Sequence, residues 1–157
     1  MKIEFWCVGK TAFSYLDEGV ALYQKRLQHY TTFDFVVIPD VKNAKSLSEA
    51  QIKMQEGALI LQKIQTDDFL VLLDERGKTF SSPQFAAYLE KMQNQSPRRL
   101  LFLVGGAYGF SEAVYARANA QISLSNMTFS HQMVRLFFIE QLYRAFTILN
   151  NEPYHHA

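Results

Sequence analysis

The chain has 157 residues, of which 48% are hydrophobic and 14% are aromatic. This length supports one hydrophobic core and the apolar content excludes a disordered chain, so we expect a single domain over 1–157. The 16 basic and 15 acidic side chains leave a net charge of +1. This balance excludes a strong overall field for nucleic acid, and any contact with RNA would come from local basic patches.

Cysteine and histidine are too sparse for a disulfide framework or a metal centre. Cys7 is the only cysteine and lies in an apolar run, which predicts a buried core residue in a reducing compartment. His131, His155 and His156 have no acidic or cysteine partners at metal-ligand spacing, so no metal is expected. The residues after Lys2 do not form a signal peptide, and no segment is long and apolar enough to span a membrane. We expect a soluble, cytoplasmic protein.

Short apolar runs rich in β-branched and aromatic residues alternate with stretches of helical periodicity. This alternation predicts an α/β fold with an open, mostly parallel sheet flanked by helices on both faces. The expected strands are 3–8, 33–38, 69–73, 100–104 and 122–124. Ligands of this fold class bind at the carboxyl ends of strands, so the loops after Leu73, Val104 and Leu124 are the expected binding loops.

Serine and proline mark the expected starts of two helices. A helix over 47–64 follows two overlapping capping-box patterns, which begin at Ser46 and at Ser48. The next helix begins at Ser82 and Pro83, with the serine as cap and the proline at the first helical position.

Two glycine motifs resemble nucleotide-binding signatures but lack the required spacing. The motif VGKT at 8–11 would need a further glycine at position 4, which is Glu4, so it is not a P-loop. The run GGAYG at 105–109 lacks the G-x-G-x-x-G spacing of a dinucleotide fingerprint. Two glycines after a buried strand still let the backbone approach a ligand without an intervening Cβ. We therefore expect a cofactor site built from loops in the last third of the chain.

The expected last helix, over about 131–150, is apolar around most of its circumference. Such a helix must bury two sides, and a domain this small offers one core face, so the pattern predicts a homodimer. Glu140 and Arg144 are one turn apart and are expected to form an ion pair. Arg135 lies about 180° around the helix from Arg144, on the apolar side. It either makes an ion pair across the dimer or faces a ligand.

Five segments carry a resemblance to a known family. They are LLD at 72–74, GG at 105–106, LSNMTFSH at 124–131, EQLYRA at 140–145 and PYH at 153–155. Over essentially its whole length the chain resembles the bacterial 23S ribosomal RNA pseudouridine N3-methyltransferases of the SPOUT (α/β-knot) superfamily. The resemblance implies an obligate dimer, a deep trefoil knot formed by the C-terminal segment over about 100–157, and S-adenosyl-L-methionine bound in that knot.

The resemblance also implies which residues contact the cofactor. They are Leu73, Gly105, Ser125, Asn126, Met127, Thr128, Phe129 and Ser130. Backbone groups of converging loops would hold the adenine and ribose, with Met127 and Phe129 as apolar walls. Many family members resemble Leu-Thr-Leu-Pro-His at 127–131, so Ser130 replaces a proline. We expect this loop to be less preorganised than in those members, with a free N–H that needs a partner.

The implied reaction is attack by N3 of a pseudouridine on the methyl group of S-adenosyl-L-methionine. N3 must lose its proton at or before that step, and His131, His155 and bulk water are the open alternatives for the acceptor. Arg135 would stabilise the negative charge that builds on the base. Tyr154 and His155 are expected to close over the target base through stacking and hydrogen bonding.

Four basic patches are expected to contact RNA. They are Lys10, Lys25-Arg26, the loop 42–45 and Arg98-Arg99. The near-neutral net charge suggests modest affinity for naked RNA and a preference for the assembled ribosome. Two other functions stay open: a small-molecule-binding α/β module without catalysis, and a non-catalytic RNA-binding factor for ribosome assembly.

Overall fold

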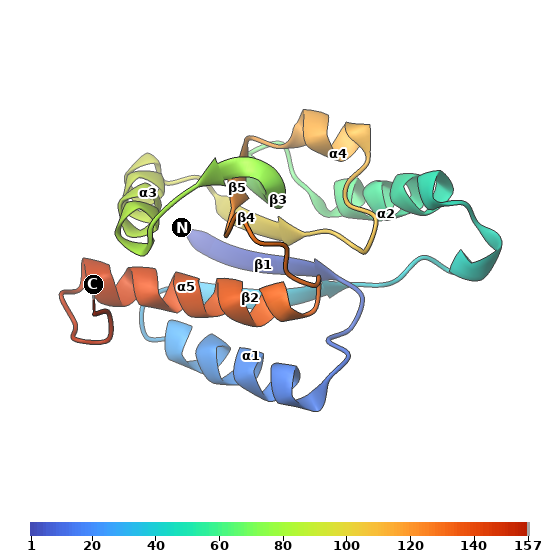
Figure 1. Ribbon diagram of the computed structural model, residues 1–157. Helices are drawn as coiled ribbons and strands as arrows, with labels where there is room; N and C mark the ends of the chain where they lie inside the picture. The colour runs from blue at the N-terminus through green and yellow to red at the C-terminus, as the bar shows by residue number, and fades with distance from the viewer. Residues whose placement is uncertain (157) are drawn as a thin grey trace.

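The computed structural model describes residues 1–156, and a five-stranded parallel sheet lies at its centre (Figure 1). The strands are β1 (Lys2–Val8), β2 (Thr32–Ile38), β3 (Asp68–Thr79), β4 (Arg99–Val104) and β5 (Ala120–Ser123). Their order across the sheet is β2-β1-β4-β3-β5. The predicted fold class is confirmed, and all five predicted strands are present. The largest difference is in β3, which continues to Thr79 instead of ending at Leu73.

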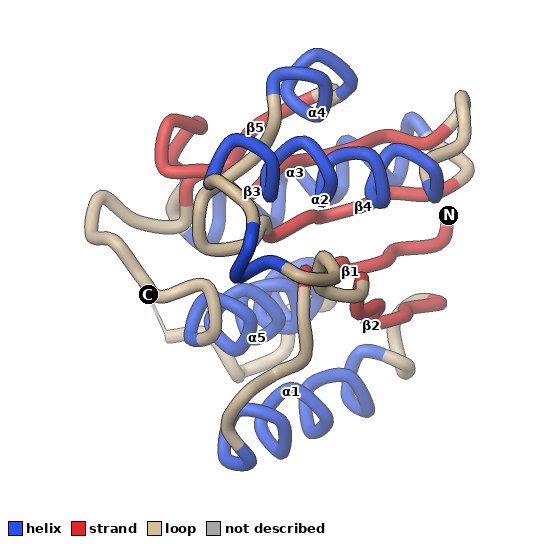
Figure 2. The backbone as a smooth tube through the Cα atoms, turned by 90° about the vertical axis from the view of Figure 1, so that its right-hand side faces the viewer, coloured by secondary structure: helices blue, strands red, loops and turns tan. Residues whose placement is uncertain are grey.

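Helices cover both faces of the sheet. They are α1 (Ser14–Leu27), the short 3₁₀ helix η1 (Ala44–Ser46), α2 (Glu49–Lys63), α3 (Ser82–Gln95), α4 (Glu112–Arg117) and α5 (Met133–Leu149). One face carries α1, α3 and α5, and the other carries α2 and α4. Figures 1 and 2 show α5 running beside α1. Within residues 1–156, no helix has the length and apolar character needed to cross a membrane.

Alternating side chains of the central strands fill two cores. Ile3, Phe5 and Cys7 of β1 pack with α1, α3 and α5, whereas Trp6 and Val8 pack with α2 and α4. Because helices cover both faces, β1 is a near-continuous apolar run, as buried parallel strands are. Cys7 is a core residue as predicted, and its burial raises the pKa of the thiol to about 12.

Serine side chains begin α2 and α3. Ser48 caps α2 in the predicted capping box. The second predicted box does not form, because Ser46 lies in η1 and its hydroxyl donates to the carbonyl of Asn43. The cap of α3 is Ser81 rather than Ser82, so the proline follows at the second helical position.

The end of β3 arches over β5, and the two backbones touch at Gly77 (Figure 1). Ile122 of β5 pairs with Leu73 and again with Lys78. A Cβ on Gly77 would lie 2.5 Å from the backbone nitrogen of Ile122, so only glycine permits this approach. β3 therefore bends around β5, so that it pairs with Ile122 on both sides of a register shift.

The last helix, α5, packs on the sheet and on two neighbouring helices. Phe138 and Leu142 face the sheet, and α1 and α3 flank the helix. Gly19 of α1 allows close contact, since a Cβ there would lie 2.7 Å from Leu136. Phe137 stays 43% exposed. The buried hydrophobic side chains of α5 all belong to one core, and the homodimer stays a prediction.

Candidate functional site

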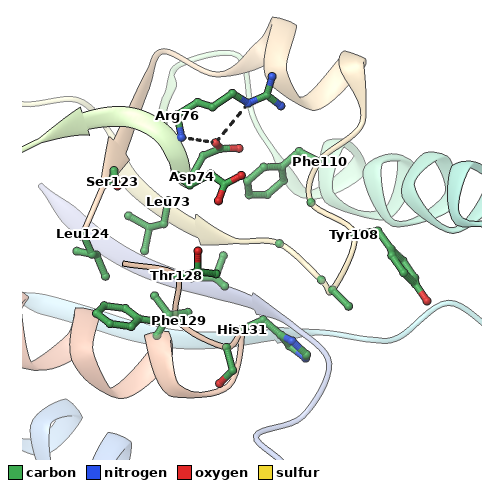
Figure 3. Close-up of a pocket in the computed structure, with 18 of the residues that line it drawn as sticks. Leu73, Asp74, Arg76, Tyr108, Phe110, Ser123, Leu124, Thr128, Phe129 and His131 are labelled. Carbon is green, nitrogen blue, oxygen red and sulfur yellow. Dashed lines mark hydrogen bonds and ion pairs between the residues drawn. The ribbon is translucent and has the colours of Figure 1, made fainter. Parts of the chain in front are cut away.

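A cavity of about 560 Å³ lies at the carboxyl ends of β3, β4 and β5 (Figure 3). Its walls are formed by three segments, 73–76, 104–110 and 122–131. Asn126 is the one residue of these segments that does not line the cavity, and Lys53, Tyr115 and Val134 complete the walls. Two of the predicted loops, after β4 and β5, thus converge on one cavity together with residues 73–76, which belong to β3 rather than to a loop. Its size is in the range of small-molecule sites.

Seven of the eight predicted cofactor residues line this cavity. They are Leu73, Gly105, Ser125, Met127, Thr128, Phe129 and Ser130. Asn126 is exposed and is not among the lining residues. Met127 is 77% exposed, so its side chain covers little of the cavity in the single chain. His131 also lines the cavity. Within residues 1–156, no three His, Cys, Asp or Glu side chains are grouped as a metal site requires.

The loop after β4 makes a tight turn at its glycines. The N–H of Gly109 donates to the carbonyl of Gly106 over 3.2 Å, and Gly109 has a φ of +81°, which favours glycine. A Cβ on Gly105 would lie 3.0 Å from the ring of Phe110. The missing side chain therefore lets Phe110 fold under the loop, and the backbone of 105–109 stays accessible from the cavity.

Serine hydroxyls order the loop after β5. Ser125 Oγ accepts from the N–H of Met127 over 2.9 Å, and Ser130 Oγ accepts from the N–H of Met133 over 3.0 Å. The carbonyl of Ser130 also accepts from the N–H of Val134 over 3.0 Å. Ser130 therefore orders the turn that leads into α5, whose N-cap position is Gln132. These bonds offset the loss of preorganisation expected from the absence of a proline.

Asp74 and Tyr115 line the cavity, although neither was among the predicted site residues. The Tyr115 hydroxyl donates to Asp74 Oδ2, and the N–H of Arg76 donates to Asp74 Oδ1 over 2.8 Å. The Asp74 side chain is only 8% exposed. Burial, followed by the hydrogen bond to Asp74, raises the pKa of the Tyr115 hydroxyl. The sequence offered one signal for Asp74, which is a carboxylate directly after the apolar run 69–73. It offered no signal for Tyr115, which comes from α4.

Arg135 lies behind the cavity wall and is fully buried. Its guanidinium donates to the carbonyls of Val8 and Gly9 over 2.8 Å, and to the Thr11 hydroxyl and the His131 carbonyl over 3.2 Å. Its position on the apolar side of α5 is confirmed. Within this chain Arg135 neither forms an ion pair nor faces the cavity. Its N–H groups donate instead to backbone carbonyl oxygens of the same chain and to the Thr11 hydroxyl. These bonds offset the cost of burying the charge and attach α5 to β1.

Tyr154 and His155 lie near the end of α5 that is remote from the cavity. The Tyr154 hydroxyl donates to Glu140 Oε1 over 2.9 Å, and His155 Nδ1 lies 3.1 Å from Arg144. The predicted ion pair between Glu140 and Arg144 is present at 2.6 Å. Arg144 and Val134 of the cavity wall are separated by about 15 Å along the helix axis. The two tail side chains therefore do not line the cavity of their own chain.

The predicted basic patches lie at two opposite edges of the sheet, because some follow the carboxyl ends of strands and others precede the amino ends. Lys10 and the loop 42–45 follow β1 and β2, at the same edge as the cavity, whereas Lys25-Arg26 and Arg98-Arg99 lie at the opposite edge. Arg99 pairs with Asp68 at 2.5 Å, and its side chain is only 17% exposed. It is therefore not available for RNA.

Comparison with known proteins agrees with this arrangement. Residues 1–155 match the family described as "Predicted SPOUT methyltransferase". The chain is 62% identical to the Ribosomal RNA large subunit methyltransferase H of Parabacteroides distasonis and 59% identical to the protein of that name from Christiangramia forsetii. Both matches extend over 156 residues and cover 99% of each chain. With its parallel sheet, its arch of β3 over β5 and this near-complete match, the chain belongs to the SPOUT methyltransferase family.

Proposed function

We propose that this protein transfers the methyl group of S-adenosyl-L-methionine to N3 of a pseudouridine in a 23S ribosomal RNA stem-loop on the assembled ribosome. The observation that carries the proposal is the convergence of the loops after β4 and β5, and of residues 73–76 of β3, on one cavity at the carboxyl edge of the sheet. The name shared by the close relatives supports ribosomal RNA of the large subunit as the substrate.

The cavity fits the cofactor in size and in chemical character. Backbone groups of 105–109 and 125–130 would bond to the polar edges of the adenine and ribose, and Leu73, Leu124 and Phe129 would pack against the adenine (Figure 3). When bound, the cofactor supplies an electrophilic methyl group on a positively charged sulfur. The carboxylate of Asp74 in the cavity wall favours such a charge.

His131 is our candidate for the proton acceptor. It lines the cavity with an exposed side chain, and an imidazole can accept a proton near neutral pH. Arg135 does not contact the target base in this proposal. It acts as a positioning residue, because it donates to the carbonyl of His131 and attaches this turn to β1.

A second copy of the chain completes the site in this proposal. A two-fold dimer in which the α5 helices run antiparallel would bring the tail of one copy to the cavity of the other. Tyr154 and His155 would then close over the target base. The same contact would cover exposed apolar side chains such as Leu22 and Phe137, which are 47% and 43% exposed in the single chain.

Two measurements test the proposal. Nucleoside mass spectrometry should find the methylated pseudouridine in wild-type ribosomal RNA and not in RNA from cells that lack the protein. Labelled S-adenosyl-L-methionine should methylate purified ribosomes faster than a free stem-loop. An unchanged set of methyl marks in the deletion cells would refute the enzymatic assignment, and equal labelling of both substrates would refute the preference for ribosomes.

Calorimetry with S-adenosyl-L-methionine separates the two alternative functions from each other. A small-molecule module binds the cofactor without methyl transfer, whereas a non-catalytic assembly factor binds RNA only.

A further inference from the structure

Two adjacent residues of α2 contact both ends of the glycine loop after β4. A Cβ on Gly106 would lie 2.7 Å from each carboxylate oxygen of Glu56, so this carboxylate rests directly on the Gly106 backbone. At the other end, a Cβ on Gly57 would collide with the hydroxyl of Ser111, the residue that caps α4. The dipeptide Glu56-Gly57 therefore contacts the loop between Gly106 and Ser111 at both of its ends.

Glu56 occupies an unfavourable place for an acidic side chain. It is only 9% exposed. Burial raises the pKa of its carboxyl, the nearby charge of Asp40 raises it further, and the N–H of Gly106 lowers it in part. Burying a carboxylate without a cationic partner reduces the stability of a fold. The contribution of Glu56 is therefore to loop geometry rather than to stability.

We infer that Glu56 is a positioning residue for cofactor binding, whose carboxylate holds the Gly106 end of the loop so that the backbone of 105–109 faces the cavity. Gly57 sets the other end of the same loop through its close contact with Ser111. A loop held in its binding conformation loses less entropy when a ligand arrives, which increases affinity. The inference rests on the proposed function, because S-adenosyl-L-methionine is the ligand that the loop would bind.

The test compares Glu56→Ala and Glu56→Gln with the wild-type protein. Gln55→Ala is the matched control, because Gln55 is the exposed neighbour on α2. Loss of the carboxylate contact with the loop should weaken the calorimetric affinity of Glu56→Ala for S-adenosyl-L-methionine about tenfold. Hydrogen exchange of the loop amides should become faster in the absence of cofactor. The Tm should stay equal or rise, and Glu56→Gln, which keeps an oxygen acceptor, should recover most of the affinity.

Three results distinguish this inference from its alternatives. Unchanged affinity together with unchanged loop exchange in Glu56→Ala would overturn it. A Tm that falls in parallel with affinity would also overturn it, because that is the behaviour of a purely structural residue. If the wild-type protein does not bind S-adenosyl-L-methionine, the proposed function fails, and the exchange rate of the loop then decides the positioning role by itself.

Discussion

The guanidinium of Arg135 donates a 2.8 Å hydrogen bond to the carbonyl oxygen of Gly9, which lies 126 residues earlier in the chain. This bond joins the first turn of α5 to the end of β1, which lies between β2 and β4 in the sheet. The loop 125–130 leads directly into that turn, so its position depends on a contact between the two ends of the chain.

Arg135→Ala is expected to lower the free energy of unfolding by about 3 kcal/mol, because the carbonyls of Val8 and Gly9 lose their charged donor. Chemical denaturation measures this loss, and cofactor affinity should fall with it. Arg98→Ala is the control, since it removes only an exposed 3.7 Å pair with Asp67. It should cost less than about 1 kcal/mol. Full stability with complete loss of turnover would instead indicate that Arg135 contacts the base.

Gly77→Ala should destabilise the fold by about 4 kcal/mol or more, because the new Cβ meets backbone atoms of β5 that cannot rotate away. Urea denaturation measures the loss. The control is Gly109→Ala, where φ is +81° but no atom lies within 4 Å of the added Cβ. Its cost should be about 1 kcal/mol. Equal stability of the two variants would mean that the arch of β3 can move away from β5.

Ser130→Ala removes the hydroxyl that accepts the 3.0 Å hydrogen bond from the N–H of Met133. We expect a loss of about 1 kcal/mol in the free energy of unfolding, which is typical of one lost hydrogen bond. Cofactor binding should weaken as well, because the turn that Ser130 orders ends the loop that lines the cavity. Ser130→Thr keeps the hydroxyl and should restore both properties. Wild-type behaviour of the alanine variant would show that the hydroxyl does not order this loop.

Asp68 should make stability depend on pH in the acid range. Burial by itself would raise the pKa of this carboxyl, but hydrogen bonds from Arg99 and from the N–H of Gln65 outweigh burial and hold the pKa below its ordinary value of 3.8. The ionised group therefore stabilises the fold above pH 3.8, and this contribution is lost as the pH falls below 3.8 toward the folded pKa.

Tm measured against pH checks this expectation in wild type and in Asp68→Asn. The variant should be less stable at neutral pH, and its Tm should fall less steeply in acid. Parallel curves for the two proteins would show that Asp68 carries none of the acid sensitivity.

Removal of residues 153–157 should leave cofactor binding nearly unchanged, because Tyr154 bonds to Glu140 at the middle of α5 and does not line the cavity. Methyl transfer should nevertheless fall by about 100-fold or more if the tail closes over the target base. A mixture of this truncated protein with His131→Ala should recover activity, since a mixed dimer contains one complete site. Two inactive variants that form mixed dimers without recovery would argue against exchange of the tail between copies.

The helices and strands could be predicted from local sequence patterns. The residues at which the helices begin could not all be predicted in this way. Parallel strands covered on both faces must be apolar throughout, so all five strands were found. Cap positions were less certain, because Ser81 and Ser82, or Ser46 and Ser48, offer the same hydroxyl within two residues. Only the position of the first helical turn selects between them.

By itself, the sequence determined the fold class, the binding loops after β4 and β5, and seven of the eight expected cofactor residues that line the cavity, because short-range periodicity and family motifs encode them. Only the tertiary structure decided what Gly77, Arg135 and Glu56 do. Their partners are Ile122, Gly9 and Gly106, which lie far away along the chain. No local periodicity records a contact between distant segments, and such contacts exist only after the sheet and the crossing of β3 over β5 have formed.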